Sequence, residues 1–173
     1  MLIRMAGAFA VISGCTMLGL YFAAREGFRI NDLQELKKAL IILSSEIEYM
    51  RNPLPEACAN IARRISNPIG PLFGLFADLL TKNEGSTAYQ LWSQAAEQSR
   101  DLAFLAEEDW EVVDGFGKTL GYLDKQMQQG AIKYALDYID DKTTALQVMS
   151  DKNKRMYRSL GIIGGLLIAV VLW

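Results

Sequence analysis

Apolar residues recur every three or four positions through the middle of the chain, a spacing that gathers them on one face of an α-helix. Prolines, glycines and polar turns divide this pattern into runs, and the strict alternation that is typical of strands is absent from the sequence. The predicted helices cover residues 33–50, 53–65, 72–80, 87–102 and 107–120, and a last helix begins after residue 124. The pattern therefore predicts an all-α fold, a bundle of about six helices.

Two helix starts and one long stripe can be assigned to particular residues. Asn31 or Asp32 is placed to cap the first helix, and Thr87 with Gln90 has the spacing of a capping box. Beyond Asp124 no proline interrupts the pattern, so one long helix is expected to continue to the C-terminal segment. Its predicted apolar stripe consists of Met127, Ala131, Tyr134, Tyr138, Ala145, Met149 and Met156.

The two ends of the chain lack charge over lengths comparable with a bilayer. Residues 5–24 carry no charged side chain, and a helix of that length spans roughly 30 Å, one hydrocarbon thickness. A cleaved signal peptide is the alternative, but its apolar core is usually shorter. Residues 160–173 are also uncharged but cover only about 21 Å as a helix, so a full span needs Ser159 and snorkelling flanks. We expect transmembrane helices over residues 5–24 and 159–173.

Basic residues near the predicted spans set the orientation. Nine lysines and arginines flank the spans on the side of residues 25–158, whereas the short N-terminus, residues 1–4, has only Arg4. The helical bundle of residues 25–158 should therefore face the cytoplasm. Small residues at helical spacing within the spans can let two helices pack closely in lipid, although glycine is common in membrane helices in any case. They are Ala10 with Gly14 and Gly161 with Gly165.

Composition excludes several kinds of chemistry. The chain of 173 residues has no histidine, which removes every mechanism that uses imidazole as a base or a metal ligand. Its two cysteines, Cys15 and Cys58, are too far apart in sequence for a CxxC pair, and a net charge of −2 gives no basic footprint for nucleic acid. We expect no enzyme activity, no cofactor, no metal and no nucleic-acid partner.

Two strings in the chain resemble chemical motifs. Gly115-Phe116-Gly117-Lys118-Thr119 ends like a phosphate-binding loop, but Val112 stands where that motif needs glycine and the string closes a helix. The acidic stretch before it, from Glu107 to Asp114, lacks the spacing of a calcium loop. It is explained either as a solvated face or as a docking patch for a basic partner.

Several short strings in a fixed order resemble one family along nearly the whole chain. They are LKKAL at 36–40, EIEY at 46–49, PLPEA at 53–57, FGKTLG at 116–121 and MYRSLG at 156–161. On these residues the chain resembles the stage III sporulation protein AB family, two-span membrane proteins of endospore-forming bacteria. In that family the glycine-rich string is an ordinary helix end rather than a nucleotide site.

The resemblance implies a subunit of the channel complex between mother cell and forespore, held in the mother-cell membrane with its bundle in the cytoplasm. The bundle would be similar to the domains of type II secretion and type IV pilus platform proteins. Its implied partners are a secretion-type ATPase (the stage III AA protein), other channel subunits and the lipid bilayer, with a homo-oligomer left open. A two-span signal transducer is the alternative function. Five residues are hypothesised to contact the ATPase: Glu107, Glu108, Glu111, Asp114 and Lys118.

Overall fold

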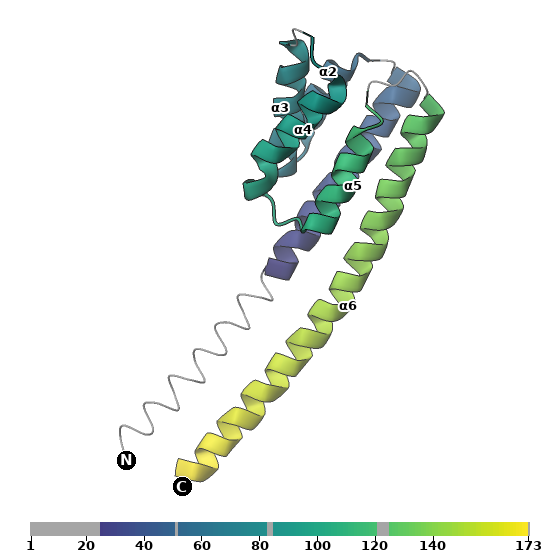
Figure 1. Cartoon of the computed structure of the whole chain (residues 1–173). Helices are drawn as coiled ribbons and strands as arrows, with labels where there is room; N and C mark the ends of the chain where they lie inside the picture. The colour runs from purple at the N-terminus through teal and green to yellow at the C-terminus, as the bar shows by residue number, and fades with distance from the viewer. Residues whose placement is uncertain (1–24, 51, 83–84, 121–124, 173) are drawn as a thin grey trace. The chain divides into compact units, whose positions relative to one another are not determined.

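The computed structural model describes residues 25–50, 52–82, 85–120 and 125–172, which form helices joined by short turns and contain no strand (Figure 1). The all-α prediction is therefore confirmed for this part of the chain. The chain divides into two compact units, Arg29–Thr143 and a second that combines Met1–Phe28 with Thr144–Trp173. The first unit contains α2, α3, α4, α5 and the beginning of α6, and the polar cluster described below lies within it.

The first helix extends over residues 25–45 and passes into a π-helical turn, Glu46–Met50. The predicted cap at Asn31 or Asp32 is wrong, because both residues lie inside this continuous helix. Asp32 instead accepts a hydrogen bond from the backbone N–H of Phe104, 72 positions away. Asp32 thus bonds to a residue distant in sequence rather than to the nearby backbone N–H groups that a helix cap would bond. The predicted apolar stripe is buried at its first four positions, Leu33, Leu36, Leu40 and Leu43.

Three short helices follow, α2 (Leu54–Arg64), α3 (Ile69–Thr81) and α4 (Ala88–Ser99), and each packs against the next (Figure 1). The prolines predicted to open α2 lie at its start. The capping box of α4 is confirmed: the Thr87 hydroxyl accepts from Gln90 N at 3.3 Å, and Gln90 Oε1 accepts from Thr87 N at 2.9 Å. Beyond Ser99 the chain makes a 3-10 turn, Arg100–Leu102, so α4 is shorter than predicted.

Trp92 of α4 lies at the centre of the core and is fully buried. Phe73, Phe76 and Phe116 approach its ring edge to face, with centroids 5.1–5.5 Å away. Its indole Nε1 donates to the carbonyl oxygen of Val113 at 3.0 Å, which satisfies the one polar atom of the buried side chain. The aromatic core and the buried indole therefore join α3, α4 and α5.

The glycine-rich string has a packing role in this core. The helix α5 (Glu107–Gly117) ends at Gly117, three residues before its predicted end, and a turn covers residues 118–120. A Cβ atom at Gly117 would lie 2.0 Å from Cδ1 of Trp92. Glycine is needed there because the helix end and the indole ring are in direct contact.

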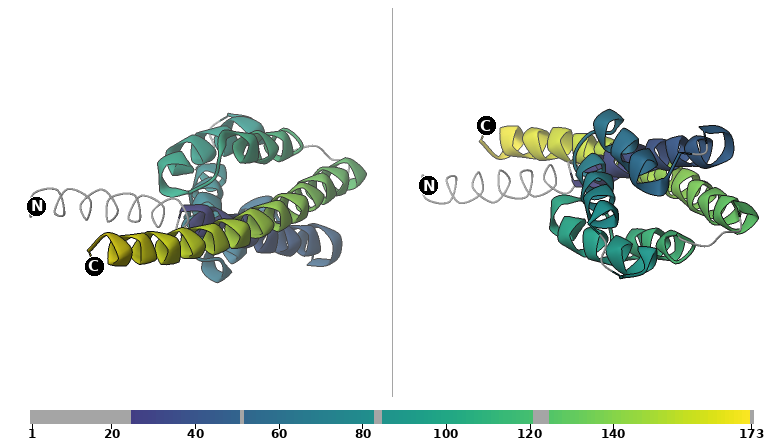
Figure 2. Two further views of the ribbon diagram at one scale, coloured as in Figure 1. Left: turned by 90° about the horizontal axis from the view of Figure 1, so that it is seen from below. Right: turned by 90° about the horizontal axis from the view of Figure 1, so that it is seen from above.

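The last helix, α6 (Lys125–Leu172), is uninterrupted, as expected (Figure 2). Its predicted stripe is wrong, since Met127, Tyr134 and Met149 are exposed by 54%, 67% and 59%. Apolar residues occur at helical spacing on both faces of this helix, so periodicity alone could not select the inner one. The face that is buried carries branched and small side chains: Ile132, Ala135, Ile139, Thr143, Leu146 and Ser150.

The predicted membrane helices fall largely beyond what can be described. Residues 5–24, with Ala10 and Gly14, lie outside the described residues, whereas residues 159–172, with Gly161 and Gly165, lie in the last part of α6, whose side chains are not described. No helix in the described part of the chain has both the length and the apolar character needed to cross a membrane.

Candidate functional site

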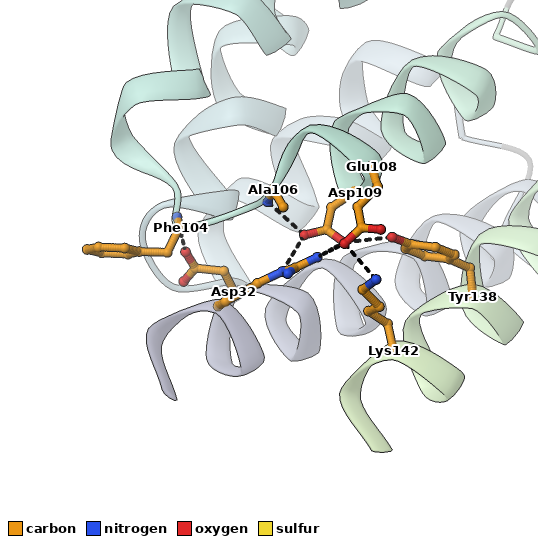
Figure 3. Close-up of polar contacts among 8 residues, drawn as sticks. Asp32, Phe104, Ala106, Glu108, Asp109, Tyr138 and Lys142 are labelled. Atoms are coloured by element: carbon orange, nitrogen blue, oxygen red, sulfur yellow. Dashed lines mark hydrogen bonds and ion pairs between the residues drawn. The ribbon is translucent and has the colours of Figure 1, made fainter. Parts of the chain in front are cut away.

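A cluster of charged side chains surrounds Asp109, which lies in the first turn of α5 and whose side chain has no exposed area. Oδ2 accepts from Nε of Arg29 and from the backbone N–H of Ala106, both at 2.8 Å. Oδ1 accepts from Nη2 of Arg29 at 2.9 Å and from the Tyr138 hydroxyl at 2.8 Å (Figure 3). Four hydrogen bonds therefore satisfy both oxygens of a buried carboxylate.

Glu108 extends the cluster toward solvent. Its Oε1 accepts from Nη2 of Arg29 at 2.8 Å and from Nζ of Lys142 at 2.6 Å, and its side chain is 52% exposed. The two cations and the two carboxylates balance, so the cluster carries no net charge. It joins three helices, because Arg29 belongs to the first helix, Glu108 to α5 and Lys142 to α6 (Figure 3).

The electrostatic effects agree with this geometry. Hydrogen bonds from Lys142 and then from Arg29 hold the pKa of Glu108 below its ordinary value. Burial, together with the hydrogen bond to Asp109, raises the pKa of Tyr138, and the bond to Asp109 raises the pKa of Arg29. These groups are thus held in the protonation states that the hydrogen bonds require, which suits a structural clamp rather than proton transfer.

A second contact fixes the loop that leads into α5. Oδ2 of Asp32 accepts from Phe104 N at 2.8 Å (Figure 3). Burial raises the pKa of Asp32, and the hydrogen bond from Phe104 opposes that shift. Further along the first helix, Nζ of Lys37 donates to Asp140 of α6 at 2.5 Å. The first helix is therefore tied to α5, to its preceding loop and to α6 by separate polar contacts.

A groove of about 320 Å³ lies between α5 and α6. Half-buried and buried apolar side chains form part of its surface, and Glu111 and Tyr134 on its rim are exposed. Gly115 and Gly130 leave it open, since a Cβ atom at either position would meet no described atom within 4 Å. The lining residues are Glu111, Val112, Gly115, Phe116, Gly130, Ala131 and Tyr134.

Comparison with known proteins places the chain in a family. The sequence profile described as Stage III sporulation protein AB matches residues 4–173. The chain belongs to the stage III sporulation protein AB family. It is 32% identical over 171 residues to Stage III sporulation protein AB of Bacillus subtilis (strain 168). The match covers 99% of each of the two chains. A solved structure of Stage III sporulation protein AB is similar with a TM-score of 0.67 and 32% identity, over 72% of this chain and 97% of that one.

Membership in this family identifies a sporulation protein and agrees with the resemblance carried by the short strings. The string FGKTLG at 116–121 contributes Phe116 and Gly117 to the packing around Trp92. Lys118, which would be the phosphate-binding lysine of a nucleotide loop, bonds to Asp114 at 2.9 Å instead. In this member of the family the described part of the string, residues 116–120, is therefore a helix end that packs on the core.

The five residues hypothesised to contact the ATPase lie on or beside α5 but do not form one free acidic patch. Glu107 bonds to Arg100 at 2.6 Å, and Glu108 belongs to the cluster around Asp109. Asp114 accepts from the Tyr89 hydroxyl at 3.0 Å and from Lys118. Glu111 differs from the others, because it makes no ion pair or side-chain hydrogen bond with any described residue and stands on the rim of the groove.

Neither the cluster around Asp109 nor the groove is predicted from the sequence. Arg29 and Asp109 are 80 positions apart, and no local pattern relates them. The sequence contains one weak indication of the groove. Gly115 and Gly130 lie inside predicted helices, where glycine lowers the stability of the helix by about 0.5–1 kcal/mol relative to alanine. Such glycines call for a packing or functional reason, and no described neighbour supplies a packing one.

Proposed function

We propose that the chain is a non-enzymatic platform subunit of the mother cell–forespore channel complex. In this role it links a cytoplasmic secretion-type ATPase, the stage III AA protein, to the membrane subunits. Family membership over residues 4–173 supports the sporulation role. The platform role is what the resemblance to this family implies, and the polar cluster, which ties three helices of the domain together, supports it.

The position of the cluster is the observation that carries the proposal. Arg29 is the first residue of the compact unit Arg29–Thr143, and Lys142 is the second to last. The cluster thus bonds α5 to the two points at which the chain enters and leaves this unit. A domain that transmits force between a motor and a membrane needs firm attachment at those points. Charge-assisted bonds, including the paired bonds from Arg29 to Asp109, supply it.

The membrane part of the proposal rests on the sequence. Residues 5–24 and 159–173 would span the membrane of the mother cell, and the excess of basic residues beside them would hold residues 25–158 in the cytoplasm. The small residues of each span, Ala10 with Gly14 and Gly161 with Gly165, would pack against each other or against the other channel subunits. The bundle would then present its surface to the ATPase.

Equilibrium binding tests this function directly. The purified full chain, kept in a neutral detergent, is titrated with the purified stage III AA ATPase from the same cell at several salt concentrations. The proposal predicts saturable binding that weakens as salt rises, because charged residues surround the proposed contact. Absence of saturable binding by a correctly folded full chain would contradict the platform role.

A further inference from the structure

We infer that the apolar loop between α4 and α5, residues 102–106, rests on the lipid bilayer beside the first predicted span. The inference rests on the membrane part of the proposed function, in which residues 5–24 cross the bilayer. The apolar surface of the loop and its attachment to the first helix come from the structure.

The apolar loop has an unusual composition for a connection between helices. Leu102 and Phe104 are exposed by 61% and 46%. The loop is a run of five apolar residues, LAFLA, and none of the five is buried. The connections before α3 and α4 are polar by contrast, with SNP at 66–68 and KNEG at 82–85. Single exposed apolar side chains are common on protein surfaces, but a run of this length outside the core indicates contact with another apolar surface.

The backbone of the apolar loop is held in place by two buried carboxylates. Phe104 N donates to Oδ2 of Asp32, and Ala106 N donates to Oδ2 of Asp109, both at 2.8 Å. Figure 3 shows the ring of Phe104 pointing away from the cluster around Asp109. The loop is therefore fixed to the domain through its backbone, while its large side chains stay on the surface.

The bond to Asp32 holds the apolar loop close to the predicted membrane surface. Residues 25–45 form one continuous helix, and Asp32 is the eighth residue after the predicted span, which corresponds to about 12 Å along that helix. Helical side chains lean toward the N-terminus of their helix, so the carboxylate of Asp32 and the N–H group of Phe104 lie nearer still. The headgroup layer outside the hydrocarbon core is roughly 5–8 Å thick. The side chains of Leu102 and Phe104 thus have the reach to enter it.

The charges around the apolar loop indicate an apolar contact rather than an electrostatic one. Asp101 and Glu107, on either side of the loop, are both exposed. Arg100 is paired with Glu97 and with Glu107, so acidic groups outnumber basic ones beside the loop. The exposed Arg25 flanks the predicted span itself, where a cation suits the headgroup layer. Anionic lipid would therefore not attract the loop, and we infer that Leu102 and Phe104 enter the interface of neutral lipid.

Site-directed fluorescence of the full chain in phosphatidylcholine liposomes tests the inference. Leu102→Cys and Phe104→Cys are each made in a Cys15→Ser background and labelled with nitrobenzoxadiazole, while Cys58 is buried in the core. Asp78→Cys, at an exposed position of α3, is the matched control. One quencher is a nitroxide-labelled phosphatidylcholine, and the other is iodide on both sides of the membrane. Circular dichroism checks that each labelled chain keeps the helix content of the unmodified one.

The inference predicts opposite responses at the loop and at the control. The nitroxide lipid should remove most of the emission of labels at 102 and 104 and little of the emission at 78. Iodide should quench the label at 78 and leave the two loop labels largely unaffected. Replacing part of the phosphatidylcholine with phosphatidylserine should not increase nitroxide quenching at the loop, and an increase would contradict the apolar contact.

The other outcomes separate the inference from the proposed function. If the chain floats with the liposomes but iodide quenches the loop labels as strongly as the control, the loop lies in water and the inference is wrong, while the membrane role stands. If the loop labels are shielded from both quenchers, a protein surface such as a second copy covers the loop, and the inference is again wrong. If the chain does not float with the liposomes, the membrane role and the inference are overturned together.

Discussion

Arg29 donates two parallel hydrogen bonds to Asp109, from Nε to Oδ2 at 2.8 Å and from Nη2 to Oδ1 at 2.9 Å. The fork of the guanidinium matches the two oxygens of the carboxylate, which makes this a strong and directional pair. Asp109 is fully buried, so removing the partner of either charge leaves an uncompensated group inside the domain.

Substitution of Asp109 by alanine should therefore be severely destabilising. We expect a loss of about 3–5 kcal/mol in the free energy of unfolding, because Arg29 would keep only Glu108 as an acceptor and the Tyr138 hydroxyl would lose Asp109. Urea unfolding of the full chain, followed by circular dichroism, measures the change. Asp78→Ala, at an exposed position of α3, is the control and should alter the free energy by less than about 0.5 kcal/mol. Equal losses in the two variants would show that Asp109 contributes no more to the free energy of unfolding than an exposed aspartate does.

Glu108 should make stability depend on pH in the acid range. Its pKa is lowered in the folded chain, chiefly by Lys142 and then by Arg29, so its contribution is full above its ordinary pKa of 4.5. The contribution is lost as the pH falls through the lowered value, because protonation removes the charge that both cations need. The free energies of unfolding of the wild type and of Glu108→Gln should therefore differ at pH 7 and converge as the pH falls below the lowered pKa of Glu108. A constant difference across this range would contradict the assignment.

The pH dependence of stability that Asp32 contributes should have the opposite sign to that of Glu108. Burial raises its pKa in the folded chain, so the fold favours the protonated form. Its contribution to stability is therefore present below the ordinary pKa of 3.8 and is lost as the pH rises through the raised value. Asp32→Asn keeps an acceptor for Phe104 N without the charge, and it should gain in stability relative to the wild type between about pH 3 and pH 7. The measurement is urea unfolding of both chains at the two pH values.

Two glycines of α5 should respond oppositely to the same change. Gly117→Ala forces a methyl group against the indole of Trp92 and should cost about 1–3 kcal/mol of stability. Gly115→Ala meets no described atom and should raise stability by about 0.5–1 kcal/mol, the difference in helix propensity. Thermal unfolding of both variants beside the wild type measures the contrast. A stable Gly117→Ala variant would show that the indole is not held where the structure places it.

The thiol of Cys58 should be inert in the folded chain. Burial raises its pKa to about 12, so almost no thiolate exists at neutral pH, and its side chain lies in the core. In a Cys15→Ser background, a thiol reagent such as dithionitrobenzoate should react only after urea is added. Rapid labelling without denaturant would mean that the α2 region opens readily.

Local patterns in the sequence were enough to predict most of the helices. Pro53 and Pro55 mark the start of α2, and Thr87 with Gln90 marks the start of α4, because capping chemistry acts over a few residues. Helical spacing with the other apolar residues of 87–102 places Trp92 on the inner face of its helix, but no local pattern predicts its hydrogen bond to Val113.

The errors arose where distant residues decide the outcome. The sequence pattern predicts Asp32 as a helix cap, whereas its hydrogen-bond partner is the backbone N–H of Phe104, 72 positions away. The predicted stripe lies on the outer face of α6, because methionine and tyrosine on that face have the same helical spacing as Ile132 and Ile139 on the other. The acidic stretch of α5, which the sequence leaves open as a solvated face or a docking patch, has most of its charges bonded within the domain, and Glu111 is the carboxylate of α5 that makes no such bond.

The central claim, that this chain holds a secretion-type ATPase at a membrane, can be tested most directly by liposome flotation. The full chain is reconstituted into liposomes, the purified stage III AA ATPase is added, and the mixture is centrifuged through a density gradient beside liposomes without the chain. We predict that the ATPase floats only with the liposomes that carry the chain, and that less of it floats at high salt. Recovery of the chain in the floating fraction without the ATPase, or sedimentation of the chain itself, would contradict the account.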